Sequence, residues 1–328
     1  MEEQKRLFEI IRTKLPKRLQ LANEVQELLG VSADTAYKRI RGETDLSFSE
    51  LVKVCRKYNV SLDEIVHKRS NQGALIHYAP VVFSNQESCI HYFQLLLEGL
   101  KHVKAAYEKE MINVAQVVPF YYFLKYPELT FFKLYVWSDM TDRSSTKFDG
   151  FLNSLEKSKF TSVFEQIYDM QSFIPSKEIW SEQTIDTTLR LIEYYFEMGA
   201  FESKDTALFL LDQLSQLLDT MKQFADNGYK GGERKTPFEL YVCSVDLGNA
   251  VVLTKSENHL SCIIRVNAFN NIATDNELLC TGIQQWMNDL ISKSIQISVI
   301  SVKERVMFFQ TLKNKINDLA QKIKLFRL

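Results

Sequence analysis

Apolar positions in the first 70 residues recur at helical spacing and are interrupted by turn and capping residues. One amphipathic segment covers 3–14 and a second covers 17–29. Gly30 ends the second segment, and Ser32 opens a third that runs to Gly42. Two capping boxes open two further helices, at Ser47-Phe-Ser-Glu50 and Ser61-Leu-Asp-Glu64. The pattern predicts a compact bundle of five short helices.

A polar, glycine-containing stretch at 68–73 separates this bundle from a longer region whose period changes part-way. Helical patterns come first, at 87–110, 151–168, 184–200 and 203–226. Short β-branched and aromatic runs follow, at 239–245, 250–254 and 260–266, with a hairpin connection expected at 245–250. A helix at 274–292, a strand at 295–300 and a helix from Ser301 to about Leu325 complete the pattern.

The expected fold class is therefore mainly α. A five-helix bundle forms domain 1–70. A C-terminal domain covers 71–328, helical over 76–226 and α+β with a small antiparallel sheet over 237–328. Composition supports this interpretation, because 11 Gly and 6 Pro are few for 328 residues while 22 Phe and 14 Tyr provide core volume.

Charge divides the chain in the same place. Residues 1–70 hold 14 Lys and Arg against 11 Asp and Glu, whereas the remainder holds 26 against 30. The positive charge is concentrated at 12–41, with seven basic and three acidic residues. A patch of this kind supplies sequence-independent attraction to a nucleic acid duplex.

The residues that carry candidate chemistry lie around the second and third predicted helices. One helix ends at Gly30, the chain turns through Val31 and Ser32, and a short helix begins, as in a helix-turn-helix. The second helix of that motif can enter the major groove of DNA and present its N-terminal half to base edges. The outward residues of that half are Ala33, Asp34, Thr35, Tyr37 and Lys38, with Arg39 and Arg41 flanking them within reach of phosphates.

Residues 19–66 resemble the helix-turn-helix domain of the phage-repressor (Xre-like) family. The resemblance rests on Leu-Gly-Val-Ser at 29–32, the slot 33–41, Gly42 and the segment 51–65. It implies base contacts by Ala33, Asp34, Thr35 and Lys38, and contacts to the DNA backbone by Ser32, Arg41 and Ser47. The run 36–43 resembles a subgroup of regulators common in Bacteroidetes, in which a long uncharacterised C-terminal region follows.

The function expected from these features is a sequence-specific, DNA-binding transcriptional regulator, with double-stranded DNA as its partner. One such module covers only about 600–1,000 Å² on DNA, so a homodimer on two half-sites is expected. The C-terminal region would provide dimerisation and a response to a small-molecule or protein effector. The alternative is a protein-interaction adaptor whose helix-turn-helix does not bind DNA.

Two apolar features of the C-terminal region have two interpretations each. Nine aromatic residues in 119–137 form either core or a ligand pocket. The pocket residues would be Tyr121, Tyr122, Tyr126, Tyr135 and Trp137, with the four tyrosines supplying polar tips. Phe309, Leu312, Ile316, Leu319, Ile323 and Phe326 alternate at spacings of three and four. This seam either packs on the sheet of its own region or forms a dimer interface.

Several classes of protein and site are not expected. No apolar run approaches the roughly 20 residues that span a bilayer, and the charged N-terminus is not a signal peptide, which favours a soluble, cytoplasmic protein. Five scattered Cys and five His show no metal-binding spacing, so neither a disulfide framework nor a metal site is expected. No nucleotide-binding or hydrolase motif is present, and we expect neither a cofactor nor catalytic residues.

Overall fold

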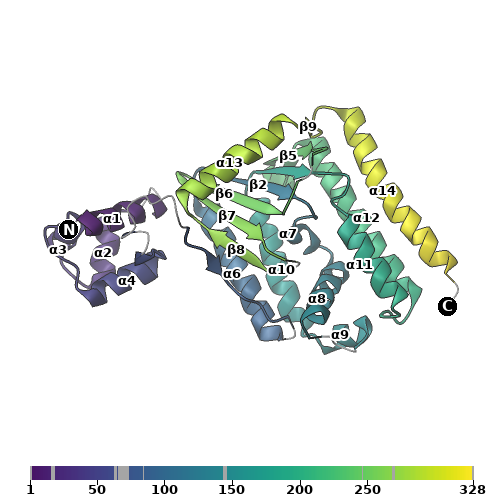
Figure 1. Ribbon diagram of the computed structural model, residues 1–328, viewed down its shortest axis with the longest axis horizontal. Coiled ribbons are helices and arrows are strands. Elements are labelled where there is room, and N and C mark those ends of the chain that lie inside the picture. Colours follow the sequence, from purple (N-terminus) through teal and green to yellow (C-terminus); the bar gives the residue numbers. More distant parts are fainter. Residues whose placement is uncertain are drawn as a thin grey trace.

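The computed structural model describes residues 2–15, 19–62, 65, 74–83, 85–142, 146–245, 247–267 and 270–326. We call the described part up to residue 65 the head and the part from residue 74 onward the body. Figure 1 shows the head at one end of the molecule and the body filling the remainder.

The head contains four helices in the described residues: α1 (Glu2–Lys14), α2 (Leu21–Leu29), α3 (Ala33–Ile40) and α4 (Phe48–Tyr58). These confirm four of the five helices predicted. The helix predicted from the second capping box falls mostly outside the described residues, as does the predicted domain boundary at 70–71. Leu7, Phe8, Ile11, Val25 and Val54 belong to a buried cluster of the head's own.

The body is built on a mixed sheet. Its strands are β1 (His77–Tyr78), β2 (Lys109–Ala115), β3 (Ser176–Trp180), β4 (Tyr229–Lys230), β5 (Thr236–Val242), β6 (Val251–Ser256), β7 (His259–Arg265), β8 (Asn271–Thr274) and β9 (Ile295–Gln296). They form a nine-stranded sheet in the order β1-β8-β7-β6-β2-β3-β5-β4, with β9 also on β5. β2, β3 and β5 run parallel, and the other pairs are antiparallel.

Helices cover both faces of this sheet. They are α6 (Gln86–Ala105), α7 (Phe120–Phe123), α8 (Pro127–Asp142), α9 (Phe148–Ser154), α10 (Lys157–Ser172), α11 (Asp186–Glu197), α12 (Lys204–Asn227), α13 (Glu277–Ser292) and α14 (Val302–Leu325). Alternate residues of β2 face opposite sides, so Met111 and Ala115 join the large core with most of these helices. Ile112 and Val114 join a second core under α13, which lies across the other face (Figure 1).

The mainly α fold class is confirmed, but the sheet differs from the prediction. It is larger than expected and mixed, because β2 and β3 lie in the part predicted to be helical. The expected helix 87–110 ends at Ala105, and its last two residues belong to β2. The expected hairpin at 245–250 is also wrong, because β5 pairs with β3 while β6 pairs with β2.

The seam of the last helix packs inside its own chain. Phe309, Leu312, Ile316, Leu319 and Ile323 are buried, and α14 lies against α12 and α11 rather than against the sheet. Phe326, the last seam residue, is partly exposed and contacts the ring of Phe196. The seam is therefore used within the body.

A carboxylate is buried where β3 meets α7. Glu178 is fully buried and accepts hydrogen bonds from Asn113, Tyr121 and Tyr122 on one oxygen and from Trp180 on the other. Burial raises the pKa of Glu178, while the positive charge of the nearby Lys230 acts against this rise. The Lys230 ammonium is also buried and donates to Gln171 Oε1 at 3.0 Å. The interior of the body thus encloses an acidic and a basic side chain that are shielded from water.

We predict that Lys230→Met lowers the free energy of unfolding by about 3–5 kcal/mol, because it leaves the Glu178 carboxylate buried without a cation. Adding Glu178→Gln should recover part of the loss. Urea unfolding followed by circular dichroism measures both variants, with the exposed Lys204→Met as control. A loss in Lys230→Met no larger than in the control would show that the two buried charges do not depend on each other.

Candidate nucleic-acid interface

The turn between α2 and α3 is fixed by residues suited to each position. Gly30 has φ +66°, a left-handed conformation that glycine adopts without steric cost, and its N–H donates to Gln26 O at 2.9 Å. Ser32 follows in extended conformation, and its Oγ accepts from Thr35 N at 3.3 Å. The chain therefore leaves α2 and enters α3 through a capped turn, as the sequence predicts.

The inner side of α3 packs on the core of the head through a small residue. Ala36 is fully buried in the head core, and Ile40 packs beside it. The opposite side is open, with exposed side chains at Ser32, Ala33, Asp34, Tyr37, Lys38 and Arg41 and with Thr35 partly exposed. We call these seven residues the outer face of α3. Except for Arg39 and Ser47, it contains every residue that the sequence assigns to DNA contacts.

The charges of this face are paired within the head. Lys38 Nζ lies 2.7 Å from Asp34 Oδ2, one helical turn earlier, and Arg41 Nε lies 2.8 Å from Glu43 Oε1. The hydrogen bond to Asp34 raises the pKa of Lys38, which therefore stays cationic. These pairs are exposed to solvent, where an ion pair contributes little to stability, so each can open at low cost.

Arg39 lies elsewhere than the sequence suggests. Its guanidinium points to α4, where Nη2 lies 3.2 Å from Glu50 Oε2 and both side chains are mostly buried. Glu50 also accepts from Ser47 N at 2.7 Å, while Ser47 Oγ caps the Glu50 N–H, which confirms the predicted capping box. Burial disfavours the Glu50 charge, but the bonds from Ser47 and the charge of Arg39 outweigh it and lower the pKa of Glu50. Arg39 is therefore placed to join α3 to α4.

A residue of α1 holds the connection from α3 to α4. Gln4 Nε2 donates to Arg39 O at 2.6 Å and to Thr44 O at 2.8 Å, and Gln4 Oε1 accepts from Leu46 N at 2.9 Å. One side chain thus satisfies three backbone groups of the loop that ends the outer face. This role of Gln4 could not be predicted from the sequence, because no local pattern links it to a loop about 40 positions away.

Phe48 is a second residue that the sequence analysis passed over. It is the first residue of α4, directly after the exposed Ser47, and 77% of its side chain is exposed. A single exposed apolar side chain is common on protein surfaces, so Phe48 is notable here only for its place beside Ser47 at the start of α4. The signal in the sequence was an aromatic residue inside a capping box, outside the apolar positions of α4.

The five candidate pocket residues lie in the core of the body. Tyr121, Tyr122, Tyr126, Tyr135 and Trp137 are all buried. The hydroxyl groups of the tyrosines bond within the chain, to Glu178, Gln216, Thr220 and Thr146. The structure thus places these side chains as the core interpretation expects, and a ligand pocket among them stays a prediction.

Residues 15–65 match a helix-turn-helix family model. The match includes the capped turn, α3 and the capping box of α4, while no curated protein and no solved structure matches the chain. The helix-turn-helix suggests a DNA-binding regulator, in agreement with the resemblance found in the sequence.

Two other kinds of feature are absent from the described part of the chain. No helix there is both long and apolar enough to cross a membrane. Nor do three or more His, Cys, Asp or Glu side chains of those residues gather where they could hold a metal ion.

We predict that Ser47→Ala destabilises the start of α4 by about 1 kcal/mol, because the Glu50 N–H loses its cap. Hydrogen exchange of the α4 amides should then speed up about fivefold where it follows local opening. Ser47→Gly is the control, since glycine at this position costs roughly a few tenths of a kcal/mol. Equal exchange in Ser47→Ala and the parent protein would contradict the role of this cap.

Proposed function

We propose that this protein is a sequence-specific, DNA-binding transcriptional regulator and not an enzyme. The observation that carries the proposal is the outer face of α3, which is open to solvent and is joined to α2 by a capped turn inside a helix-turn-helix match. In this proposal α3 lies in the major groove, which at about 12 Å is wide enough to admit an α-helix.

The outer face offers suitable chemistry for base edges. Lys38 can donate to the O6 and N7 acceptors of guanine, and Asp34 can accept from the amino group of cytosine. Ser32, Arg41 and Ser47 are exposed around α3 and would contact the phosphate backbone. Tyr37 and Thr35 complete the face, and Ala33 allows close approach at the start of the helix.

The ion pairs of Lys38 and Arg41 would lower the affinity of one head for DNA. DNA has to compete with Asp34 for Lys38 and with Glu43 for Arg41, so the electrostatic gain of one head is smaller than its charge count suggests. A small module with paired charges supports the proposal of a homodimer, because two heads on two half-sites add their contacts. We propose the body as the dimerisation region and assign no effector to its buried tyrosines.

The general test is selection of bound sequences from a random DNA library with the full chain. A palindromic product is expected, because a two-fold dimer reads two inverted half-sites. No enrichment over background would refute the proposal and favour the alternative, an adaptor whose helix-turn-helix contacts proteins.

We predict that Lys38→Ala weakens binding to the selected sequence by about 1–3 kcal/mol, with relaxed specificity at one base position. Arg41→Ala should weaken binding to all sequences alike and reduce the slope of affinity against salt by about one. Fluorescence anisotropy at several salt concentrations measures both. Lys303→Ala, an exposed lysine of α14, is the control and should bind as the parent protein does.

We predict that Asp34→Asn strengthens non-specific DNA binding several-fold, because it removes a negative charge and frees Lys38 for phosphates. Glu43→Gln should act in the same direction through Arg41. Unchanged or weaker binding to random duplex DNA in both variants would show that the outer face does not meet the duplex.

A further inference from the structure

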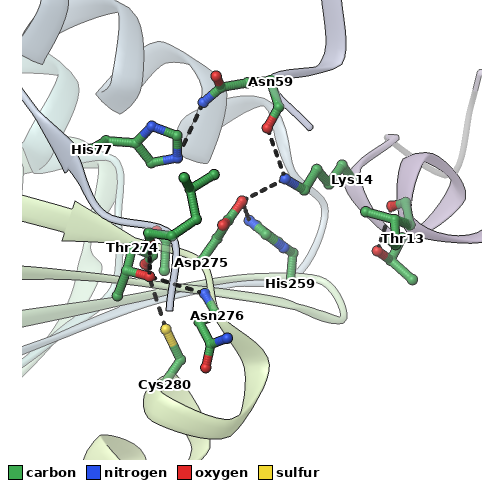
Figure 2. A network of polar contacts seen from close by, with 12 residues as sticks. Thr13, Lys14, Asn59, His77, His259, Thr274, Asp275, Asn276 and Cys280 are labelled. Atoms are coloured by element: carbon green, nitrogen blue, oxygen red, sulfur yellow. Dashed lines mark hydrogen bonds and ion pairs between the residues drawn. The ribbon is translucent and has the colours of Figure 1, made fainter. Parts of the chain in front are cut away.

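The head meets the body at a small polar junction. Lys14, the last residue of α1, places its ammonium Nζ 2.6 Å from the Oδ2 of Asp275, which precedes α13 (Figure 2). The two side chains are only 15% and 13% exposed. This ion pair is therefore better shielded than the pairs on the outer face of α3, where 47% and 71% of Lys38 and Asp34 are exposed.

A second helix of the head reaches the same point. Lys14 Nζ also donates to the backbone oxygen of Asn59 at 3.2 Å, and Asn59 is the residue that caps α4. The Asn59 side-chain nitrogen lies 3.4 Å from His77 Nε2 of β1 (Figure 2). The ends of α1 and α4 therefore both contact the body at this junction, so the head is held against the body at two points.

In the body, both neighbours of Asp275 are held by hydrogen bonds. On one side of it, Thr274 Oγ1 donates to Leu75 O at 2.6 Å; on the other, Asn276 caps α13 by accepting from Leu279 N at 3.0 Å. The backbone of Asp275 can thus change position only if the end of β8 or the start of α13 moves with it.

Among the described residues, the charge of Asp275 has few partners apart from Lys14. In that part of the chain its Oδ1 is buried without a hydrogen-bond partner, and His259 Nε2 is 3.9 Å from Oδ2. Burial lowers the pKa of His259, with the charge of Asp275 acting in the opposite direction and those of Lys14 and His102 adding to the fall. This shift favours the neutral imidazole, and among the described residues it is Lys14 that places a cation 2.6 Å from the carboxylate.

The orientation of the head determines which part of the body lies beside the outer face of α3. A groove of about 640 Å³ has Tyr37 and Arg41 in its lining together with Glu257 and Asn258 of the β6–β7 turn. The turn of the body and the outer face of α3 thus border one hollow. A change in the angle between head and body would change what DNA meets beside α3.

We propose that the Lys14–Asp275 ion pair is a positioning contact that fixes the head on the body and so sets the direction of α3. That the ion pair fixes the head does not depend on the proposed function. Its consequence for DNA binding does. In a dimer, the pair holds the two recognition helices at one separation, so the protein selects DNA by the spacing of half-sites as well as by their sequence.

The test compares full-length Asp275→Asn with Asp289→Asn, which removes an exposed carboxylate from α13. Small-angle scattering should show a larger radius of gyration and a longer maximum dimension for Asp275→Asn alone, because the head then takes several orientations. The exchanged pair, Lys14→Asp with Asp275→Lys, should restore the parent values. Circular dichroism checks folding, and Lys14→Met replaces Asp275→Asn if the latter does not fold.

The DNA measurement uses duplexes that carry two copies of the selected half-site at different separations. The parent protein should prefer one separation, and Asp275→Asn should lose that preference, with affinity at the preferred separation falling about tenfold. Affinity for one half-site should stay unchanged. A spacing preference that survives in Asp275→Asn, or scattering identical to that of the parent, would overturn the inference. If no variant and no parent protein binds DNA, the proposed function fails, and the scattering result still decides on the positioning contact.

Discussion

Both faces of β2 and β3 have to be kept from water, and this requirement explains where most helices of the body lie. These two strands lie at the centre of the sheet with apolar residues on each side, so a single layer of helices cannot cover them. Most of the helices, from α6 to α12, therefore pack on one face, while α13 crosses the other. α14 closes the outside of the helical layer by burying its seam against α12 and α11. The head stays outside this arrangement because it has a core of its own.

Signals that act within a few residues were readable from the sequence. Gly30, Ser32 and the capping box at Ser47 each determine the backbone beside them, and the structure confirms the helix boundaries that they predict. The outer face of α3 was predictable for the same reason, because helical periodicity alone separates Ala36 from the exposed residues around it. The last helix begins at Val302, as expected, but without such a signal: the Ser301 side chain makes no capping bond, and its backbone is left-handed.

Features that depend on distant residues could not be predicted. β2 and β3 carry the polar residues Asn113 and Glu178 at buried positions, so the sequence does not show that these segments are buried strands. The groups that surround Glu178, such as Tyr122 and Lys230, come from other elements. Arg39 looked like a phosphate contact, since nothing near it in the chain shows that Glu50 would attract it. Lys14 and Asp275 are the extreme case, because only the folded chain brings together a residue of α1 and one that precedes α13.

The three hydrogen bonds of Gln4 make the first helix part of the surface that would meet DNA. The loop between α3 and α4 is shaped from α1, so the recognition region is not a portable segment that begins at α2. The shortest fragment that keeps this surface has to start before Gln4, even though the helix-turn-helix match begins at residue 15. A domain boundary drawn from sequence similarity alone would cut away one of its supports.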